Sequence, residues 1–136
     1  MEREDVKLQV ALDLLNKERA IRIAKEAVKG GVDWIEAGTP LIKSEGIDII
    51  RELRDVFPDK KIIADMKTMD VGGVEVEIAA KAGADIIGVL GAADDETIKE
   101  AIRAARNYDA EVLADLIRVE DQVKRTEEVC ELGVDY

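Results

Sequence analysis

The amino-acid sequence predicts an α/β fold of the (β/α)8 TIM-barrel type, truncated to about five βα units and the start of a sixth strand. Three observations predict this fold. Short apolar segments alternate with amphipathic ones, the alternation repeats about every 50 residues, and ionisable residues follow the apolar segments. We expect residues 1–136 to form a single incomplete barrel domain, because a closed TIM barrel needs eight strands.

The apolar segments have the length and composition of buried strands. Aromatic residues make up only 3% of the chain, so the core is expected to consist of Ile, Val, Leu and Ala. The expected strands, in order, are residues 8–12, 33–37, 61–65, 85–90 and 110–115. Strands this short and apolar, each followed by a helix, are typical of a parallel sheet covered by helices.

The amphipathic segments between these strands have the period of helices. The expected helices, in order, are residues 17–29, 44–56, 72–82, 94–107 and 119–132. The second should end before Pro58, because the residue preceding a proline is disfavoured in a helix. The sequence "VEVE" at 74–77 alternates like a strand, but its flanks favour a helix.

Glycines and aspartates recur with the same period of about 50 residues. The repeated glycines are Gly31, Gly83 and Gly133. We expect them to terminate helices, because glycine adopts the left-handed conformation required there at least cost. Aspartates follow two residues later, at the starts of expected strands, where we interpret them as structural: Asp33, Asp85 and Asp135.

A second set of ionisable residues lies where the expected strands end. The carboxyl ends of parallel strands meet at one edge of a sheet, where α/β folds place their active sites. The candidate site residues at this edge are Asp13, Glu36, Asp65, Lys67, Asp70 and Asp115. The sequence therefore predicts a site made of five acids and one lysine.

The residue types at this edge favour a particular chemistry. In an extended segment Asp65 and Lys67 point to the same side, and a lysine among carboxylates keeps its proton and can act as a point charge or an acid. Asp70 can anchor that lysine or reach a neighbouring subunit. Glu36 and Asp65, from adjacent strands, suit Mg²⁺, which prefers few protein ligands and hard oxygens. A divalent ion and a lysine together can stabilise an enediolate in sugar-phosphate chemistry.

Simpler interpretations exist for several of these residues. Asp13 and Asp115 could cap the helices that follow them, and Asp65, Lys67 and Asp70 could form a surface ion pair. Glu36 lies between apolar residues and needs a partner. Two methionines, Met66 and Met69, are expected to pack in the interior, and two glycines, Gly88 and Gly91, allow backbone or ligand to approach closely.

Composition excludes several classes of function. A net charge of −11 without a basic run argues against binding to nucleic acid, and no apolar run approaches the length of a membrane span. Histidine is absent, which excludes histidine-based triads and zinc sites within this chain. The single cysteine, Cys130, is expected on the buried face of a helix, and cytoplasm is the expected location.

Several of these segments resemble the orotidine 5′-monophosphate decarboxylase suprafamily, and most of all its 3-hexulose-6-phosphate synthase branch. The matching segments are "LQVALD", "IEAGTPL", "ADMKTMD" and "AGADIIGVLG". The sister branch, 3-keto-L-gulonate-6-phosphate decarboxylase, tends to carry a glutamate where this chain has Asp115, so "VLADLI" favours the synthase. The resemblance extends over essentially the whole chain and identifies it with the N-terminal portion of these proteins.

The resemblance implies a role for each candidate residue. Glu36 and Asp65 would bind Mg²⁺, Lys67 would stabilise the enediolate, and Asp70 would act across a dimer. Asp13 and Asp115 would contact the substrate. The implied reaction is the Mg²⁺-dependent aldol addition of formaldehyde to D-ribulose 5-phosphate, giving D-arabino-3-hexulose 6-phosphate, or its reverse. The decarboxylase reaction is the alternative.

The resemblance also implies what this chain lacks. The catalytic histidine of the family would follow Tyr136, as would the groups that bind the substrate phosphate. We therefore expect impaired turnover, and an inactive barrel fragment with a structural role is a further alternative. An unclosed sheet exposes two edges, so we expect a homodimer or higher assembly.

Overall fold

The computed structural model of the protein describes residues 6–136, so residues 1–5 of the predicted domain lie outside the described part. Five strands form one sheet: β1 (Gln9–Leu12), β2 (Trp34–Ala37), β3 (Lys61–Thr68), β4 (Ile86–Leu90) and β5 (Glu111–Asp115). The helices are α1 (Lys17–Gly30), α2 (Thr39–Glu45), α3 (Asp48–Val56), α4 (Gly72–Ala82), α5 (Asp95–Arg106) and α6 (Gln122–Leu132). The predicted α/β class and its five strands are confirmed.

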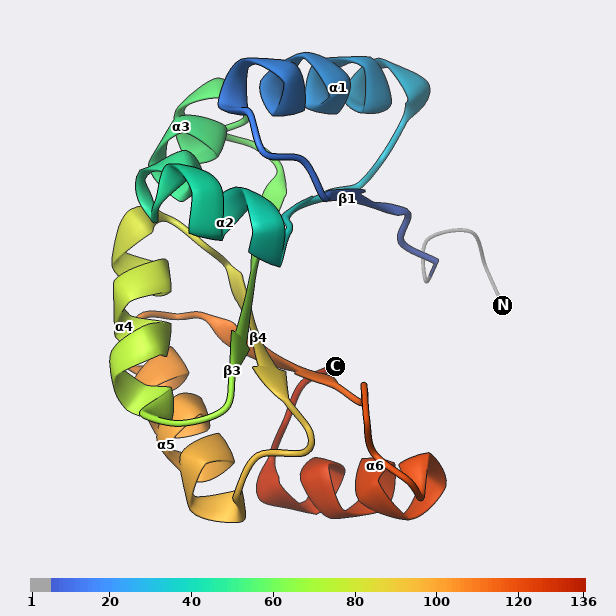
Figure 1. The fold of residues 1–136 in the computed structure, drawn as a ribbon, viewed down its shortest axis with the longest axis vertical. Helices are drawn as coiled ribbons and strands as arrows, with labels where there is room; N and C mark the ends of the chain where they lie inside the picture. The colour runs from blue at the N-terminus through green and yellow to red at the C-terminus, as the bar shows by residue number, and fades with distance from the viewer. Residues whose placement is uncertain (1–5) are drawn as a thin grey trace.

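The strands are all parallel, and their order in the sheet is their order in the chain. Because crossovers between parallel strands are right-handed, a sequential order places every connecting helix on the same side of the sheet. Figure 1 shows this arrangement, with the helices in an outer arc around the strands. A doubly wound sheet would instead reverse its strand order, so the sheet has the singly wound pattern of a barrel wall.

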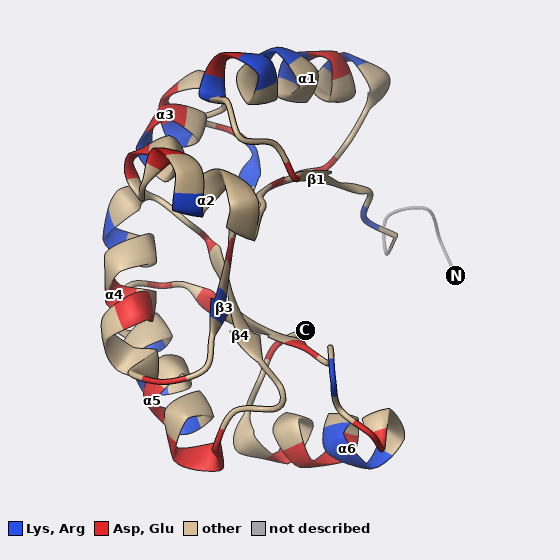
Figure 2. Ribbon diagram, viewed as in Figure 1, with Lys and Arg blue, Asp and Glu red and all other residues tan. Residues whose placement is uncertain are grey.

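The core lies between the sheet and this arc of helices, and it is aliphatic as expected. Strand residues that face the helices are fully buried, among them Leu12, Ile35, Ile62, Ile87 and Val112. Acidic and basic residues are distributed over the outer helices (Figure 2). The strand side chains that do not face the helices point to the opposite side, which is the inner face of the sheet.

The expected helix at 44–56 is wrong in its bounds, because the structure has two helices there. Gly46 ends α2 with a φ of 77°, and α3 begins two residues later. Helix α2 has seven residues, too few to show an amphipathic repeat. A proline in its first turn, Pro40, is a signal for its start that the sequence analysis did not use. Helix α3 ends at Val56, before Pro58 as predicted, and "VEVE" lies in α4.

Two packing expectations are wrong. Cys130 is exposed, because Val129, one residue earlier, takes the buried position on α6. Successive helix residues differ in direction by about 100°, so neighbours rarely share a buried face. Met69 is 55% exposed in the loop after β3, whereas Met66 packs against the core as predicted.

The repeated glycines and aspartates have the structural roles predicted for them. Gly31, Gly83 and Gly133 end α1, α4 and α6 with φ values of 99°, 109° and 104°. Each aspartate that follows accepts a hydrogen bond from a backbone N–H of the preceding strand region: Asp33 from Leu8 at 2.8 Å, Asp85 from Ile62 at 2.7 Å, and Asp135 from Val112 at 2.8 Å. These bonds fix the start of each strand pair.

In two of these three turns, an arginine side chain adds further contacts. Arg54 donates to the carbonyl of Gly83 and pairs with Asp85. Arg106 donates to the carbonyl of Gly133 at 3.3 Å and pairs with Asp135 at 2.9 Å. The two arginines are themselves about 50 residues apart, so the repeat extends to a side chain that sequence analysis did not identify.

We predict that replacing Asp135 by alanine lowers the free energy of unfolding by about 1–2 kcal/mol near neutral pH, since a backbone N–H and Arg106 lose their acceptor. Burial favours the neutral acid, but Arg106 and the Val112 N–H outweigh it and lower the pKa of Asp135. The stabilisation is therefore present above about pH 4 and lost as the pH falls through the lowered pKa.

Urea unfolding across this pH range measures the effect. Glu127→Ala, which removes an exposed acid from α6, is the control and should change stability by less than about 0.5 kcal/mol. An Asp135→Ala deficit that stays constant down to about pH 2 would contradict the assigned role of the ionised carboxylate.

Candidate active site

The candidate residues lie at the carboxyl ends of the strands, as predicted. Asp13 directly follows β1, Glu36 lies in β2, Asp65 and Lys67 lie in β3, and Asp115 is the last residue of β5. Glu36 pairs in register with Ile63, and Leu90 pairs with Asp115. Parallel pairing thus brings side chains from four strands to one edge of the inner face.

Lys67 is the centre of this group. Its Nζ lies 2.7 Å from Oδ2 and 2.9 Å from Oδ1 of Asp65, and 2.6 Å from Oδ2 of Asp115. Asp65 is the more buried of the two acids, with 14% of its side chain exposed against 29% for Asp115. The ammonium therefore links β3 to β5 across the end of β4.

The backbone that carries Lys67 is not regular strand, so the extended geometry assumed from the sequence is wrong. Ala64 pairs with Ile87 and Thr68 with Val89, so four residues of β3 advance against two of β4. Lys67 itself has a φ of 50°, in the left-handed region. Such a bulge re-aims a side chain, and a non-glycine residue in this conformation stores about 1–3 kcal/mol of strain. Asp65 and Lys67 lie on the same side and contact each other, as predicted, within this bulge.

The contacts of Lys67 favour the charged forms of both Lys67 and Asp115. Burial would lower the pKa of Lys67, but hydrogen bonds to Asp115 and Asp65 outweigh it and raise the pKa above its ordinary value. Burial likewise favours neutral Asp115, but Lys67 and the Ile117 N–H lower its pKa overall. Near neutral pH the site thus holds an ammonium between two acids, with one face toward solvent.

Glu36 has the partner that the sequence analysis required, and it is Gln9 of β1, whose amide nitrogen donates to Oε2. Burial raises the pKa of Glu36; the Gln9 bond opposes this, and the nearby charges of Asp65 and Asp13 add to the rise. Gln9 was missed, although its parallel register with Trp34 places it two residues below Glu36 on the same face.

Asp13 does not cap the following helix. Asn16 does so by accepting the N–H of Arg19 at 2.9 Å. Likewise α6 is capped by Asp121, while Asp115 accepts the N–H of Ile117 at 2.9 Å. The capping interpretation is therefore wrong for both acids, and their carboxylates remain at the strand ends.

Thr39 is a second residue that sequence analysis missed. Its hydroxyl lies 2.7 Å from the backbone oxygen and 2.9 Å from Oδ2 of Asp65. Thr39 is the first residue of α2, so this short helix fixes the carboxylate that Lys67 contacts. The signal was available in "GTP", where the threonine follows the strand end directly.

Asp70 does not join the group within this chain. Its carboxylate accepts the N–H of its neighbour Val71 at 2.7 Å, in the loop between β3 and α4. Asp65 and Asp115 anchor Lys67 instead, so the expectation that Asp70 could anchor it is wrong. Its reach toward another subunit stays a prediction.

A Mg²⁺ ion fits the donor set at Glu36 and Asp65, although residues 6–136 contain no group of three or more acid, cysteine or histidine side chains arranged for a metal. Both are hard-oxygen ligands on adjacent strands, and Mg²⁺ commonly takes only one or two carboxylates beside water and substrate oxygens. Burial is the main cause of the raised pKa of Glu36, and the neighbouring charges of Asp65 and Asp13 add to it.

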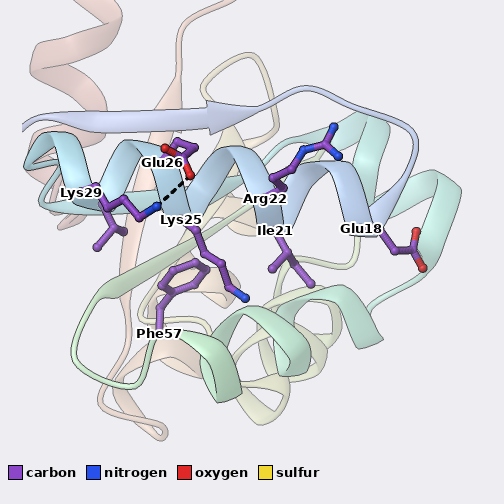
Figure 3. A pocket seen from close by; sticks show the side chains of 8 residues that line it. Glu18, Ile21, Arg22, Lys25, Glu26, Lys29 and Phe57 are labelled. Carbon is purple, nitrogen blue, oxygen red and sulfur yellow. Dashed lines mark hydrogen bonds and ion pairs between the residues drawn. The ribbon is translucent and has the colours of Figure 1, made fainter.

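A well-formed hollow of about 370 Å³ lies elsewhere, on helix α1 (Figure 3). Ile21, Val28 and Phe57 form its apolar part, and charged residues of α1 surround it. One pair of these, Lys29 and Glu26, is joined at 3.0 Å. That pair lies on one helix with side chains that are 73% and 67% exposed, whereas Lys67 joins acids of two strands and is less exposed, so the strand ends are the stronger candidate site. Within residues 6–136, no helix has the length and apolarity required to cross a membrane.

Fold and site together define an α/β protein of the TIM-barrel type with an acid–lysine–acid group at the carboxyl ends of its strands. Residues 6–136 match the model of the orotidine 5′-phosphate decarboxylase / HUMPS family. The chain belongs to this family, as its sequence motifs indicated.

Relatives within the family are close. The 3-hexulose-6-phosphate synthase of Mycobacterium gastri is 49% identical over 131 residues, which are 96% of this chain and 63% of that protein. A crystal structure of 3-hexulose-6-phosphate synthase superposes with a TM-score of 0.94 at 50% identity, over 96% of this chain and 63% of that one. The crystal structure of 3-keto-L-gulonate-6-phosphate decarboxylase from Vibrio cholerae superposes with a TM-score of 0.87 at 33% identity, over 94% of this chain and 59% of that one. This chain thus spans about 63% of the length of the synthases it matches.

We predict that Thr39→Val lowers the free energy of unfolding by about 1–2 kcal/mol, because a hydrogen bond to a charged, part-buried acceptor is lost. Thr39→Ser keeps the hydroxyl and should retain most of this stability. Chemical denaturation of both variants measures the difference. A Thr39→Val variant as stable as the wild type, or a Thr39→Ser variant that loses more stability than Thr39→Val, would contradict the assignment of the effect to the bond with Asp65.

Proposed function

We propose that this chain carries the metal-and-lysine part of a 3-hexulose-6-phosphate synthase site. The observation that carries this proposal is the Lys67 ammonium, held at 2.7 Å from Asp65 and 2.6 Å from Asp115. The synthase names of relatives at up to 49% identity support it. The proposed reaction joins formaldehyde to D-ribulose 5-phosphate through an enediolate.

Glu36 and Asp65 are the residues that would hold Mg²⁺. When bound, the ion would supply a Lewis acid that polarises the carbonyl group of the sugar phosphate. Thr39 contributes by fixing one oxygen of Asp65, and Gln9 by fixing one oxygen of Glu36. These contacts orient the two ligands without occupying the second oxygen of Glu36.

Lys67 supplies the positive charge where negative charge develops. A general base takes a proton from the carbon next to the ketone of ribulose 5-phosphate and leaves an enediolate, and a fixed ammonium stabilises its oxygens more than those of the ketone. The enediolate carbon then attacks formaldehyde, and the protonated base returns the proton to the new alkoxide. Hydrogen bonds to Asp115 and Asp65 outweigh burial and raise the pKa of Lys67, which favours the charged ammonium. Asp13 and Asp115, at the ends of β1 and β5, are proposed to accept hydrogen bonds from substrate hydroxyls.

The 3-keto-L-gulonate-6-phosphate decarboxylase reaction is the second candidate, since it would pass through an enediolate of the same type and would use the same lysine. The structure of such a decarboxylase at 33% identity supports the shared site. Asp115 favours the synthase, because the decarboxylase branch tends to carry a glutamate at this position. For the 136-residue chain alone we propose slow turnover, with an inactive structural fragment as the limiting case.

The proposed partner is a second copy of the chain, docked on an apolar patch around Asp70. The patch consists of Met69, Val71, Val74 and Ile78, which are 55%, 51%, 57% and 43% exposed. It lies on α4 and the loop before it, and Val71 holds a left-handed φ of 47° there. An exposed apolar stripe next to an acid without a cationic partner in this loop favours association. Docking here would bring Asp70 toward the site of the second copy.

We expect the chain to fix formaldehyde onto ribulose 5-phosphate with Mg²⁺, not to do so with excess EDTA, and not to release CO₂ from 3-keto-L-gulonate 6-phosphate. Lys67→Met should lower the rate at least about 100-fold, because one fixed charge is lost from the transition state. Lys99→Met is the control, since Lys99 forms a surface pair with Glu96 on α5. If CO₂ release is faster than formaldehyde fixation, the decarboxylase is favoured. If the chain catalyses neither reaction, the inactive fragment is favoured.

Val74→Asp should convert a dimer of this chain into a monomer, because a charge on the patch cannot be buried without a partner. Sedimentation velocity over a range of protein concentrations measures the change. Val123→Asp is the matched control, since Val123 is 75% exposed on α6, away from the patch. A wild-type chain that sediments as a monomer at all concentrations would contradict the proposed interface.

A further inference from the structure

Glycines lie beside the acids at the ends of the strands. Gly38, directly after β2, is the neighbour of Asp13 after β1, and its N–H bonds the Leu12 carbonyl at 3.2 Å. Gly88 in β4 is the neighbour of Asp65 in β3, one position beyond the pair Ala64 and Ile87. Each acid thus has, on the next strand, a position without a side chain.

Both glycines leave space that the acid fills. A Cβ added to Gly38 would lie 2.2 Å from Oδ1 of Asp13 and 2.8 Å from the carbonyl oxygen of Leu12. One added to Gly88 would lie 3.2 Å from Oδ1 of Asp65, 3.4 Å from its Cα and 3.5 Å from the carbonyl oxygen of Ala64. Neither glycine has a positive φ, so close approach, and not backbone conformation, accounts for them.

Gly88 is the more informative of the two, because the bulge of β3 begins beside it. The register between β3 and β4 shifts between Ala64 and Thr68, the segment that contains Asp65 and Lys67. Two of the three atoms that a side chain at Gly88 would meet belong to the β3 backbone. These two backbone atoms are at ordinary contact distance, so the tight contact is the one with Oδ1 of Asp65, the oxygen that accepts a hydrogen bond from Lys67 Nζ at 2.9 Å. A Cβ at Gly88 must therefore push this carboxylate oxygen away, and a larger side chain must also press on the backbone of the bulge.

The internal repeat shows what Gly88 replaces. Counted from the repeated aspartates Asp33 and Asp85, Gly88 occupies in β4 the position that Glu36 occupies in β2. Asp65 therefore has a carboxylate on one neighbouring strand and an empty position on the other. The empty side is the side toward β5, where Asp115 completes the contacts of Lys67.

We propose that Gly88 is the positioning residue of this site: because it has no side chain, the Asp65 carboxylate can lie beside it, where the Lys67 ammonium spans Asp65 and Asp115. A side chain at Gly88 displaces Asp65 and weakens its hydrogen bonds with Lys67. The effect of Gly88 on turnover rests on the proposed function, whereas its effect on the Lys67 contacts does not.

The direct test is NMR of the lysine ammonium groups in the ¹⁵N,¹³C-labelled chain, with Lys67 assigned by the signal missing in Lys67→Arg. In the wild type we expect Lys67 Nζ to show couplings across its hydrogen bonds to the carboxylate carbons of Asp65 and Asp115. Gly88→Ala should weaken the Asp65 coupling, and Gly88→Val should abolish it. Gly30→Ala is the matched control, because a Cβ at Gly30 meets nothing within 4 Å, and it should leave both couplings unchanged.

A double-mutant cycle gives a second, independent measurement. If the 3.2 Å approach to Asp65 causes the damage, Gly88→Ala should destabilise the chain less in an Asp65→Ala background than in the wild type. Strictly additive effects on stability would overturn the proposal, as would couplings in Gly88→Ala and Gly88→Val that match the wild type. A wild-type chain in which Lys67 shows no coupling to Asp65 would overturn it as well.

Turnover separates this proposal from the proposed function. Loss of formaldehyde fixation in Gly88→Ala, together with a weakened Asp65 coupling and an unchanged Gly30→Ala control, supports both. If the wild type converts neither substrate, the proposed function fails, and the couplings still decide the role of Gly88. If the couplings weaken while kcat and KM stay at wild-type values, Gly88 does not position the group for this reaction, and the proposal is overturned.

Discussion

Parallel pairing of five strands in sequential order is the constraint from which the arrangement of the site follows. It directs every strand toward the same edge and leaves all the helices on one side. Asp65, Lys67 and Asp115 therefore gather at that edge, within contact distance of one another. Their charges must therefore be balanced locally, and Lys67 does this by pairing with acids of β3 and β5.

The fold was predictable because its signals are local and repeated. Alternating apolar and amphipathic segments fix the order of elements, and the glycine–aspartate repeat fixes where helices end and strands begin. Helix α2 was missed because seven residues are too few to establish a helical period. Cys130 was misplaced for a related reason, since a shift of one residue in helical phase exchanges a buried side chain for an exposed one.

The candidate site was predictable in its members more than in its geometry. A strand end marks Asp13, Asp65 and Asp115 in the sequence, and parallel order implies that they converge. The bulge could not be predicted in this way, because it is a shift of register between β3 and β4. Such a shift depends on both strands and is not encoded by either one alone. Gln9 and Thr39 were missed because each bonds an acid 27 or 26 residues away in the sequence, although "GTP" at the end of β2 was a local signal for Thr39.

The contacts of Arg54 at Gly83 and of Arg106 at Gly133 have a consequence for how such a chain can arise. Each arginine connects a helix end, a turn and a strand start within one stretch of about 50 residues. A module that secures its own boundaries can be copied in tandem without redesigning the module next to it. The fold therefore lends itself to growth by gene duplication, with catalytic groups diverging at the free ends of otherwise equivalent strands.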